Sequence, residues 1–326
     1  MPVSGSLRTK HDEDFASDGL PREFAADVRA GLSKPQKELH SKYLYDHLGS
    51  SLFEAITHLP EYGLTRADER LLEAHATQIA RSIPTPASVI ELGSGTGRKT
   101  RHILKEMSGA RYFPIDVSAE ALERCEYELA GVAEIYALQR FYLDGMASAV
   151  AQRRPHETLL VLFLGSTIGN FERPCAREFL RDLRCCLEPG DALLIGADLV
   201  KPVDRMLMAY DDPTGVTAAF NLNLLGRINR ELGGHFQLRN FEHQALWNGP
   251  ERRIEMHLRS SIEQSVYIEA ADLRASFLAG ETIWTESSHK FEPAEMLDMA
   301  EKTGFHVRTQ WVDDDWPFVE SLWVVR

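Results

Sequence analysis

The feature that most constrains this fold is the alternation of apolar runs with segments of helical length. Strand-like runs occupy Ala87–Leu92, Arg111–Val117, Leu159–Gly165 and Ala192–Leu199. Because these runs carry few polar residues, the strands must be buried on both faces, as in a parallel sheet covered by helices on each side. The chain is therefore predicted to be an α/β protein with a Rossmann-like sheet.

A glycine-rich turn follows the first of these strands. The sequence Glu91-Leu-Gly-Ser-Gly-Thr-Gly97 stands between the strand and a helix expected from Lys99. Glycine tolerates positive φ angles and lets a ligand approach the backbone closely, so the turn can wrap a nucleotide-derived cofactor. The next strand ends at Asp116, where a carboxylate can accept hydrogen bonds from both hydroxyls of a ribose.

Two cofactor classes compete for this turn. Dinucleotide-binding enzymes use GxGxxG, whose following helix receives the pyrophosphate at its N-terminus. Here the turn reads GSGTGRK, without a third glycine at that offset and with an acidic residue two positions before the first glycine. This E-x-G-x-G-x-G form resembles the first motif of Rossmann-fold methyltransferases, and with the following Asp116 it favours a methyltransferase that uses S-adenosylmethionine (SAM). The spacing from Gly97 to Asp116 also suits an NAD-dependent oxidoreductase, which stays open, and Glu91 taken alone fits a residue that merely caps the sheet edge.

The chain changes character after Lys201. A helical pattern covers Met206–Asn229, interrupted by DDPTG, and alternating segments follow at Arg252–Ser261, Ser265–Ala270 and Thr285–Phe291. Alternation of polar and apolar residues predicts antiparallel strands, here in a second α+β lobe. The C-terminal segments GFHVRTQWVD and SLWVVR fit strands at the edge of the main sheet.

The remaining segments are predicted to be mostly helical after a loose, polar start at residues 1–20. Helices are expected from Pro21, near Ser51–Ile56, over Arg66–Ser82, from Ser118 and over Cys175–Leu187.

Charge and composition narrow the possible partners. The formal net charge of -13 disfavours nucleic acid and favours a small-molecule ligand. No apolar run is long enough to span a membrane, and MPVSGSLRTKHDEDF lacks the apolar core of a secretory signal, so a cytoplasmic location is expected. The four cysteines form no CxxC and the histidines no HExxH, so no structural metal is expected.

Several stretches outside the glycine turn carry a resemblance to one family. They are DVRAGL (Asp27–Leu32), YDHLGSSLFEAITHLPEY (Tyr45–Tyr62), FLGSTIGN (Phe163–Asn170), AYDDPTGVTAAFN (Ala209–Asn221), RIEMHLR (Arg253–Arg259) and TESSHKF. With ELGSGTGRKT, they resemble the L-histidine Nα-methyltransferases of ergothioneine biosynthesis over nearly the whole chain after residue 20. The resemblance implies a class I methyltransferase sheet in residues 68–200 and a substrate-binding lobe built from both chain ends, residues 21–67 with 201–326.

The same resemblance implies a reaction. SAM would donate a methyl group three times to the α-amino nitrogen of free L-histidine, giving the betaine hercynine and S-adenosyl-L-homocysteine. Free L-histidine and its mono- and dimethylated forms would be the substrates. A related α-N-methyltransferase acting on tyrosine or tryptophan is the nearest alternative, and a catalytically silent binding protein is a more distant one.

Roles for individual residues also follow from the resemblance. Tyr45, Asn170 and the Gly165 carbonyl would lie at the amine. The amino-acid backbone and the ring would be bound by Tyr62, Asn170, Tyr210, Met256, Glu286, Ser288 and Phe53. The cofactor would be bound by Glu91, Gly93, Ser94, Gly95, Lys99, Asp116, Tyr142 and Asp144.

Elementary chemistry supports the ring-binding roles. Glu286 and Ser288 are two residues apart on a predicted strand, so both side chains point to one face. A carboxylate accepts an imidazole N–H, and a hydroxyl can serve the other ring nitrogen. Met256 would supply a polarisable apolar wall. Taken singly, each residue also fits a plainer role, since Met256 can be packing, Glu286 a solvated edge carboxylate and Tyr210 a turn residue.

The resemblance weakens around the adenine. Family members often carry an Asp followed by an aromatic residue there, whereas this chain reads ALQRFYLDG. Phe141 would then occupy the place of that Asp. After a local shift Asp144 would substitute for it, with Tyr142 or Leu143 against the ring.

Overall fold

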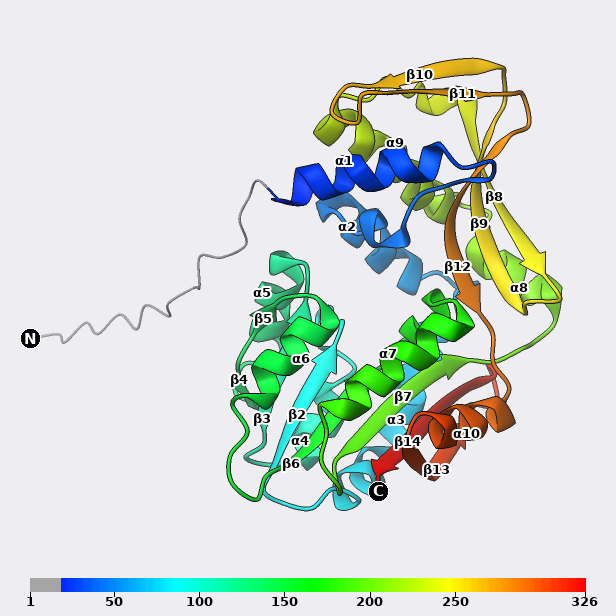
Figure 1. Ribbon diagram of the computed structural model, residues 1–326. Coiled ribbons are helices and arrows are strands. Elements are labelled where there is room, and N and C mark those ends of the chain that lie inside the picture. The colour runs from blue at the N-terminus through cyan, green and yellow to red at the C-terminus, as the bar shows by residue number, and fades with distance from the viewer. Residues whose placement is uncertain (1–18) are drawn as a thin grey trace, which may run out of the picture.

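An eight-stranded sheet forms the larger lobe of the computed structural model, which describes residues 19–326 (Figure 1). The strand order is β13-β14-β7-β6-β2-β3-β4, with β5 paired to β3. The four central strands run parallel and are buried almost throughout. These strands are β2 (Ala87–Leu92), β3 (Arg111–Asp116), β6 (Thr158–Phe163) and β7 (Ala192–Asp198). All four predicted strands, and the α/β class, are confirmed.

The two edges of this sheet differ. On one side short strands β4 (Glu134–Ile135) and β5 (Leu138–Gln139) pair with β3. On the other, β14 (Phe318–Val325) runs antiparallel to β7 and pairs with β13 (Phe305–Val312). The predicted C-terminal edge strands are confirmed. Residues 305–325 therefore lie in the large sheet and not in the second lobe to which the predicted boundary assigned them, because the apolar hairpin completes the edge beside β7.

Helices cover both faces of the large sheet. Apolar side chains along β2 alternate, so Val89 contributes to one core and Ile90 and Leu92 to the other. The first face is covered by α3 (Leu64–Arg81), α4 (Arg101–Glu106) and α5 (Ala119–Glu128), and the second by α6 (Tyr142–Val150), α7 (Arg173–Cys185) and α10 (Pro293–Lys302). The helix predicted from Lys99 begins two residues later.

The smaller lobe is α+β, as predicted, and combines the N-terminal segment of the described chain with residues 203–289, which follow β7 (Figure 1). Its four-stranded sheet has the order β1-β12-β9-β8, and a separate hairpin joins β10 and β11. These strands are β1 (Lys37–Glu38), β8 (Phe241–Asn248), β9 (Arg253–Ser260), β10 (Gln264–Ile268), β11 (Leu273–Phe277) and β12 (Thr282–His289). β8 and β11 were not predicted.

Four α-helices and two short 3-10 helices complete the smaller lobe. They are α1 (Gly19–Leu32), α2 (His47–Thr57), α8 (Val203–Tyr210), α9 (Val216–Leu232), η1 (Ser41–Leu44) and η3 (Leu238–Asn240). The DDPTG segment separates α8 from α9, because the Asp212 carboxylate accepts the backbone N–H groups of Val216 and Thr217 at the start of α9. Of the predicted loose segment, residues 1–18 lie outside the described residues, and Gly19 and Leu20 begin α1.

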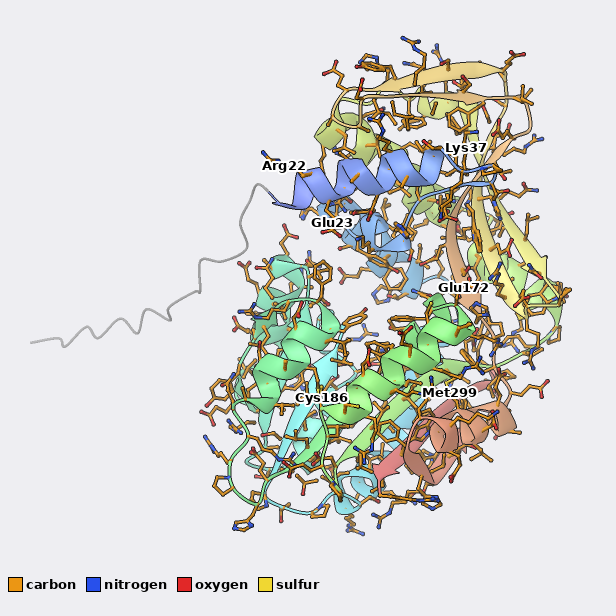
Figure 2. All side chains as sticks on the ribbon, viewed as in Figure 1. Arg22, Glu23, Lys37, Glu172, Cys186 and Met299 are labelled. Carbon is orange, nitrogen blue, oxygen red and sulfur yellow. The ribbon has the colours of Figure 1, made fainter. Side chains whose placement is uncertain are left out.

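The two lobes are joined beside β12. A short helix, η2 (Thr167–Asn170), packs against this strand, and a Cβ on Gly169 would lie only 2.9 Å from the His289 carbonyl oxygen. Glu172, just before α7, also forms an ion pair with Arg253 of β9 at 2.6 Å (Figure 2). The absence of a side chain at Gly169 therefore allows η2 to approach the second sheet.

Replacing Gly169 with Ala should lower the free energy of unfolding by about 1–3 kcal/mol, because the new methyl group meets backbone atoms that cannot turn aside. Urea unfolding would measure the change. Gly249→Ala is the control, since a Cβ there meets only Trp247 Nε1 at 3.5 Å, an ordinary contact. Equal stability of the two variants would contradict the close packing of η2 on β12.

Candidate active site

The glycine turn has the backbone geometry that its sequence predicts. Gly93, Gly95 and Gly97 have φ angles of +73°, +53° and +69°. A Cβ on Gly97 would lie 2.6 Å from Cys125 Sγ, so only glycine fits there. Around Gly95, in contrast, no heavy atom of the described chain beyond the two neighbouring residues lies within 4 Å of the Cβ position. A ligand can therefore reach the backbone at the centre of the turn.

Asp116 lies beside this open space. Its two oxygens accept the backbone N–H groups of Gly95 and Ser118, each at 3.0 Å. Burial raises the pKa of Asp116, and these hydrogen bonds lower it in part. Each oxygen keeps a lone pair that can accept a ligand hydroxyl.

Glu91, the acidic prefix of the turn, lies beneath it. Its buried carboxylate accepts the Thr100 hydroxyl at 2.6 Å and also the Tyr112 hydroxyl. Burial raises the pKa of Glu91 to about 7, although these two hydrogen bonds lower it in part. Glu91 therefore links β2, β3 and the segment after the turn, and its direct contact with a cofactor stays a prediction.

The turn also presents Ser94 and Lys99. The Ser94 hydroxyl is buried and has no hydrogen-bond partner among residues 19–326, so it is available to a ligand. The Lys99 ammonium pairs with Asp68 of α3 and lies close to Gly165, 3.5 Å from where a Cβ on that glycine would stand. Lys99 thus reaches from the turn after β2 to the turn after β6.

Asp68 organises the segment that carries Gly165. Its Oδ2 accepts Lys99 and the backbone N–H of Gly165, the latter at 3.0 Å. The fully buried Glu320 lies alongside, and burial with the nearby Asp68 charge raises the pKa of Glu320 well above its usual range. A protonated Glu320 can donate to Asp68, whose Oδ1 has no other partner in the described chain.

At the start of α6, Tyr142 lies next to the glycine turn, whereas Asp144 is exposed to solvent. The Tyr142 hydroxyl lies 3.3 Å from the position that a Cβ on Gly93 would take, so this side chain borders the turn. Asp144 lies two residues later in the helix and is exposed, as is Phe141, the N-cap. No contact in the described structure links Asp144 to the turn, and its role at the adenine stays a prediction.

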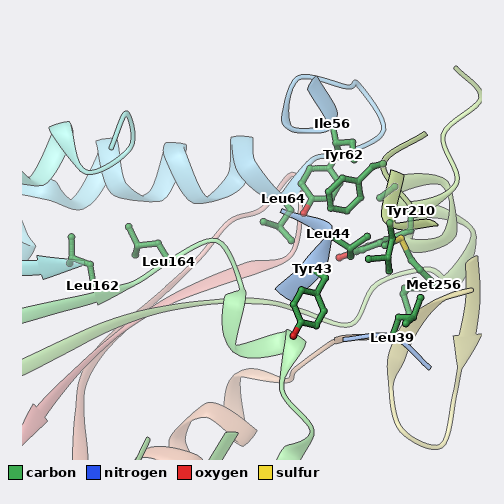
Figure 3. Close-up of a cluster of buried hydrophobic side chains, with 14 of the residues drawn as sticks. Leu39, Tyr43, Leu44, Ile56, Tyr62, Leu64, Leu162, Leu164, Tyr210 and Met256 are labelled. Atoms are coloured by element: carbon green, nitrogen blue, oxygen red, sulfur yellow. The ribbon is translucent and has the colours of Figure 1, made fainter. Parts of the chain in front are cut away.

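Across from the turn, aromatic side chains of the smaller lobe form a wall. Tyr45 makes edge contacts with Phe53 at 5.5 Å and with Phe220 at 5.6 Å between ring centroids. The ring centroids of Tyr62 and Tyr210 lie 6.0 Å apart, and both residues belong with Met256 to one buried cluster (Figure 3). The resemblance did not single out Phe220, which completes the wall.

Glu286 faces this wall from β12. Met256 is its partner on β9 in the antiparallel register, so both side chains lie on the same face of the sheet. Burial raises the pKa of Glu286 to about 7, and the Lys290 charge and the Tyr45 hydroxyl lower it in part. The carboxylate is thus close to Tyr45 and is not a solvated edge residue.

Ser288 belongs to a buried polar network. Its hydroxyl lies 2.7 Å from the Tyr210 hydroxyl and 2.9 Å from Lys290 Nζ. Lys290 forms an ion pair at 2.8 Å with Asp198, at the end of β7. Glu286 and Ser288 lie on one face of β12, and their joint role in binding a ring stays a prediction.

Asn170 and Gly165 lie on the segment between β6 and α7. Asn170 is half-buried at the end of η2, the helix that packs on β12. Gly165 has a φ of +70°, and no group in the described part of the chain donates to its carbonyl. The amide and the carbonyl are thus available to a ligand amine.

Electrostatic coupling connects the two halves of the site. Burial raises the pKa of Tyr45 well above its usual range, and the nearby charge of Glu286 and the hydroxyls of Tyr62 and Tyr142 add to the effect. Since Tyr142 borders Gly93, Tyr45 lies between a side chain of the glycine turn's surroundings, Tyr142, and Glu286 of β12. The predicted cofactor and substrate residues therefore meet between the two lobes.

Three polar residues of the site were missed by sequence reasoning. Asp198 ends β7 and Lys290 follows Ser288 by two residues, which places it on the same strand face, but a lysine in a strand normally suggests an exposed position. Asp68 lies on α3 in a segment without any recognisable motif. Only the fold brings Asp198 and Lys290 together.

The described residues contain neither a candidate metal cluster nor a candidate membrane-spanning helix. Across residues 19–326, no three His, Cys, Asp or Glu side chains are grouped so that they could hold a metal ion. Within the same range, no helix has the length and apolar character needed to cross a membrane.

Comparison with known proteins yields one family. Residues 24–325 match the family described as "Histidine-specific methyltransferase, SAM-dependent". A histidine N-alpha-methyltransferase of Mycolicibacterium smegmatis is 41% identical, over 94% of this chain and 97% of that protein. An ergothioneine biosynthesis protein 1 of Neurospora crassa is 37% identical over 60% of this chain and 23% of that protein.

More distant relatives include an L-tryptophan methyltransferase of Psilocybe serbica, 28% identical over 91% of both chains. Among solved structures, a 1,6-didemethyltoxoflavin-N1-methyltransferase of Burkholderia thailandensis aligns with 99% of this chain and 93% of its own. That alignment has a TM-score of 0.43 and 11% identity. This similarity is too low to define the fold, which is defined by the strand order of the large sheet.

The raised pKa of Glu286 predicts a pH-dependent stability. Because the folded-state value of about 7 exceeds the ordinary 4.5, ionisation of Glu286 opposes folding, and the cost grows as pH rises from 4.5 to 7. Glu286→Gln should therefore raise the free energy of unfolding by up to about 3 kcal/mol at pH 8, and by less than about 1 kcal/mol at pH 5.

Urea unfolding at both pH values measures this difference. Glu263→Gln, which changes an exposed carboxylate of the same lobe, should leave the stability within about 0.5 kcal/mol at either pH. A gain from Glu286→Gln that is equal at pH 5 and pH 8 would show that the carboxylate is not desolvated.

Proposed function

The chain belongs to the family of histidine-specific, SAM-dependent methyltransferases, and on that premise we propose that it trimethylates the α-amino group of free L-histidine. The product would be hercynine, an intermediate of ergothioneine biosynthesis. The mono- and dimethylated forms of histidine would be successive substrates of the same site. A cytoplasmic location is part of this proposal.

One observation carries the choice of histidine. Glu286 and Ser288 lie on one strand face within a wall of aromatic side chains, and Met256 lies beside Glu286. A carboxylate and a hydroxyl match the N–H and the second nitrogen of an imidazole. A site that offers buried polar groups rejects a ring without matching hydrogen bonds far better than an apolar pocket does.

The residues of the turn fit SAM. The open backbone at Gly95, the unpaired Ser94 hydroxyl and the half-buried Asp116 carboxylate provide room and hydrogen-bond groups for the adenosine part. Lys99 can bind a carboxylate of the amino-acid part by exchanging its contact with Asp68. When bound, SAM supplies a methyl group already activated by its sulfonium.

The protein's own task is to present a neutral amine in the right direction. Tyr45 keeps its proton, because burial raises its pKa well above the usual range, so it acts as a hydroxyl partner and not as a base. The Asn170 amide and the Gly165 carbonyl can hold the amine hydrogens. Orientation of this kind contributes up to about 7–11 kcal/mol in favourable systems. The displaced proton would pass to water.

Successive methylation turns the amine into a fixed cation that can no longer donate hydrogen bonds. The ring centroids of Tyr45, Phe53 and Phe220 lie within 6 Å of one another, and their faces would surround this cation if Tyr45 lies at the amine. Cation–π attraction can thus replace the lost hydrogen bonds.

A second aromatic amino acid is the alternative substrate. Tryptophan is the specific candidate, because one relative of this chain is an L-tryptophan methyltransferase. However, an indole offers one N–H and no ring acceptor, so it would leave the Ser288 hydroxyl without a hydrogen bond to the ligand ring. Incubation with SAM and all twenty amino acids, followed by mass measurement, separates the two. Trimethylhistidine supports the proposal, and a methylated tryptophan or tyrosine in its place contradicts it.

Tyr45→Phe and Asn170→Ala should each lower kcat for histidine by about tenfold or more, since each removes a group that orients the amine. The KM for SAM should stay within about twofold. Mass spectrometry of the mono-, di- and trimethylated products in single-turnover experiments would resolve the three steps. Unchanged rates for all three steps in both variants would remove these residues from the amine site.

Glu286→Ala should raise the histidine KM by about tenfold to a hundredfold, because the hydrogen bond from the imidazole is charge-assisted and worth about 1.5–3 kcal/mol. The KM for SAM should not change. Steady-state kinetics with the Glu263→Gln control would measure both constants. If Glu286→Ala left the histidine KM unaltered, the carboxylate would not bind the ring.

A further inference from the structure

Lys290 occupies an unusual position for a lysine. Its side chain is completely buried, and three acceptors surround its Nζ atom. They are Asp198 Oδ2 at 2.8 Å, the Tyr210 hydroxyl at 2.9 Å and the Ser288 hydroxyl at 2.9 Å. An ammonium group has three N–H bonds and no acceptor, so this environment uses all of its donors.

Asp198 anchors this ammonium group. Its other oxygen accepts Lys201 Nζ at 2.6 Å and Trp316 Nε1 at 2.9 Å. Burial alone would raise the pKa of Asp198, but the charges of Lys290 and Lys201 outweigh it and lower the pKa. Asp198 therefore stays ionised and holds Lys290 in place.

Lys290 restricts the hydrogen-bonding roles of the Tyr210 and Ser288 hydroxyls. Both the Tyr210 and the Ser288 oxygen accept from Lys290, and they bond to each other at 2.7 Å. Either hydroxyl can be the donor of this bond by geometry, and the greater acidity of a phenol favours Tyr210 as the donor and Ser288 as the acceptor. The Ser288 oxygen then accepts two hydrogen bonds, and only its own hydrogen is left for a ligand.

We propose that Lys290 is a positioning residue that makes Ser288 an obligatory hydrogen-bond donor toward the substrate ring. This inference rests on the proposed function. The site would then present one acceptor, Glu286, and one donor, Ser288, which matches a neutral imidazole in a single orientation. Without the ammonium group, the Ser288 hydroxyl can rotate and can also accept a hydrogen bond from the ring. The site then no longer selects a single orientation of the imidazole.

The arrangement is costly if it serves stability alone. A buried ion pair contributes little to the free energy of folding. Replacing both of its partners with apolar residues of similar size is often neutral or stabilising. Lys201 provides a matched comparison, because it also pairs with Asp198 in the interior but touches neither Ser288 nor Tyr210. A role in ring recognition therefore distinguishes Lys290 from Lys201.

The test combines Lys290→Met with Ser288→Ala. Lys290→Met should raise the histidine KM about tenfold while the KM for SAM stays within twofold. In the Ser288→Ala background, the same change should raise the histidine KM less than about threefold, because the group through which Lys290 acts is gone. An equal loss in both backgrounds would overturn the proposal.

Two further variants keep the test decisive. Lys201→Met should leave the histidine KM within about threefold, and Lys290→Gln, which keeps an N–H donor, should recover part of the loss. If Lys290→Met does not fold, the Lys290→Gln variant in both backgrounds gives the same comparison. If the native protein makes no methylated histidine, the proposed function fails. If it does but Lys290→Met leaves the histidine KM unchanged, only the role of Lys290 fails.

Discussion

The contact between Asp198 and Lys290 is the interaction on which the arrangement of the site depends. Asp198 ends β7 of the large sheet, and Lys290 follows β12 of the smaller one. Backbone hydrogen bonds join the same two segments, from Phe291 to the Asp198 carbonyl and from Val200 to the Phe291 carbonyl. The lobes are thus connected beside Ser288, one of the side chains proposed to bind the substrate ring. A shift of one sheet against the other would have to break an ion pair inside the protein.

The large sheet explains why a ligand site forms at this place. Along the chain, the order of strands reverses between β2 and β6, with β3 on one side and β7 on the other. At such a point the connections leave in opposite directions and a crevice opens at the carboxyl ends of the strands. The glycine turn follows β2 and Gly165 follows β6, so both flank this crevice. Lys99 spans it through Asp68.

The site is built from groups that oppose folding. Burial raises the pKa of both Glu91 and Glu286 to about 7, and the Ser94 hydroxyl has no hydrogen-bond partner within residues 19–326. Each of these groups lowers stability in the free protein, and each is suited to a ligand or to support of the glycine turn. Such local conflicts with folding are expected where a surface is organised for binding.

The sequence by itself determined the α/β class, the four central strands and the turn that follows β2. Strands that are apolar throughout must be buried on both faces of a sheet. The glycines at positions 93, 95 and 97 indicate a turn with positive φ angles, which is a local property of the backbone. It also placed Glu286 and Ser288 on one face, because the period of a strand is two residues. It did not reveal β8, whose side chains are mostly half-buried and show no clear alternation. The tertiary structure alone decided that a lysine is buried beside Ser288, since its counter-ion Asp198 lies 92 positions earlier in the chain. Long-range pairing of charges leaves no local pattern, whereas periodicity and backbone conformation do.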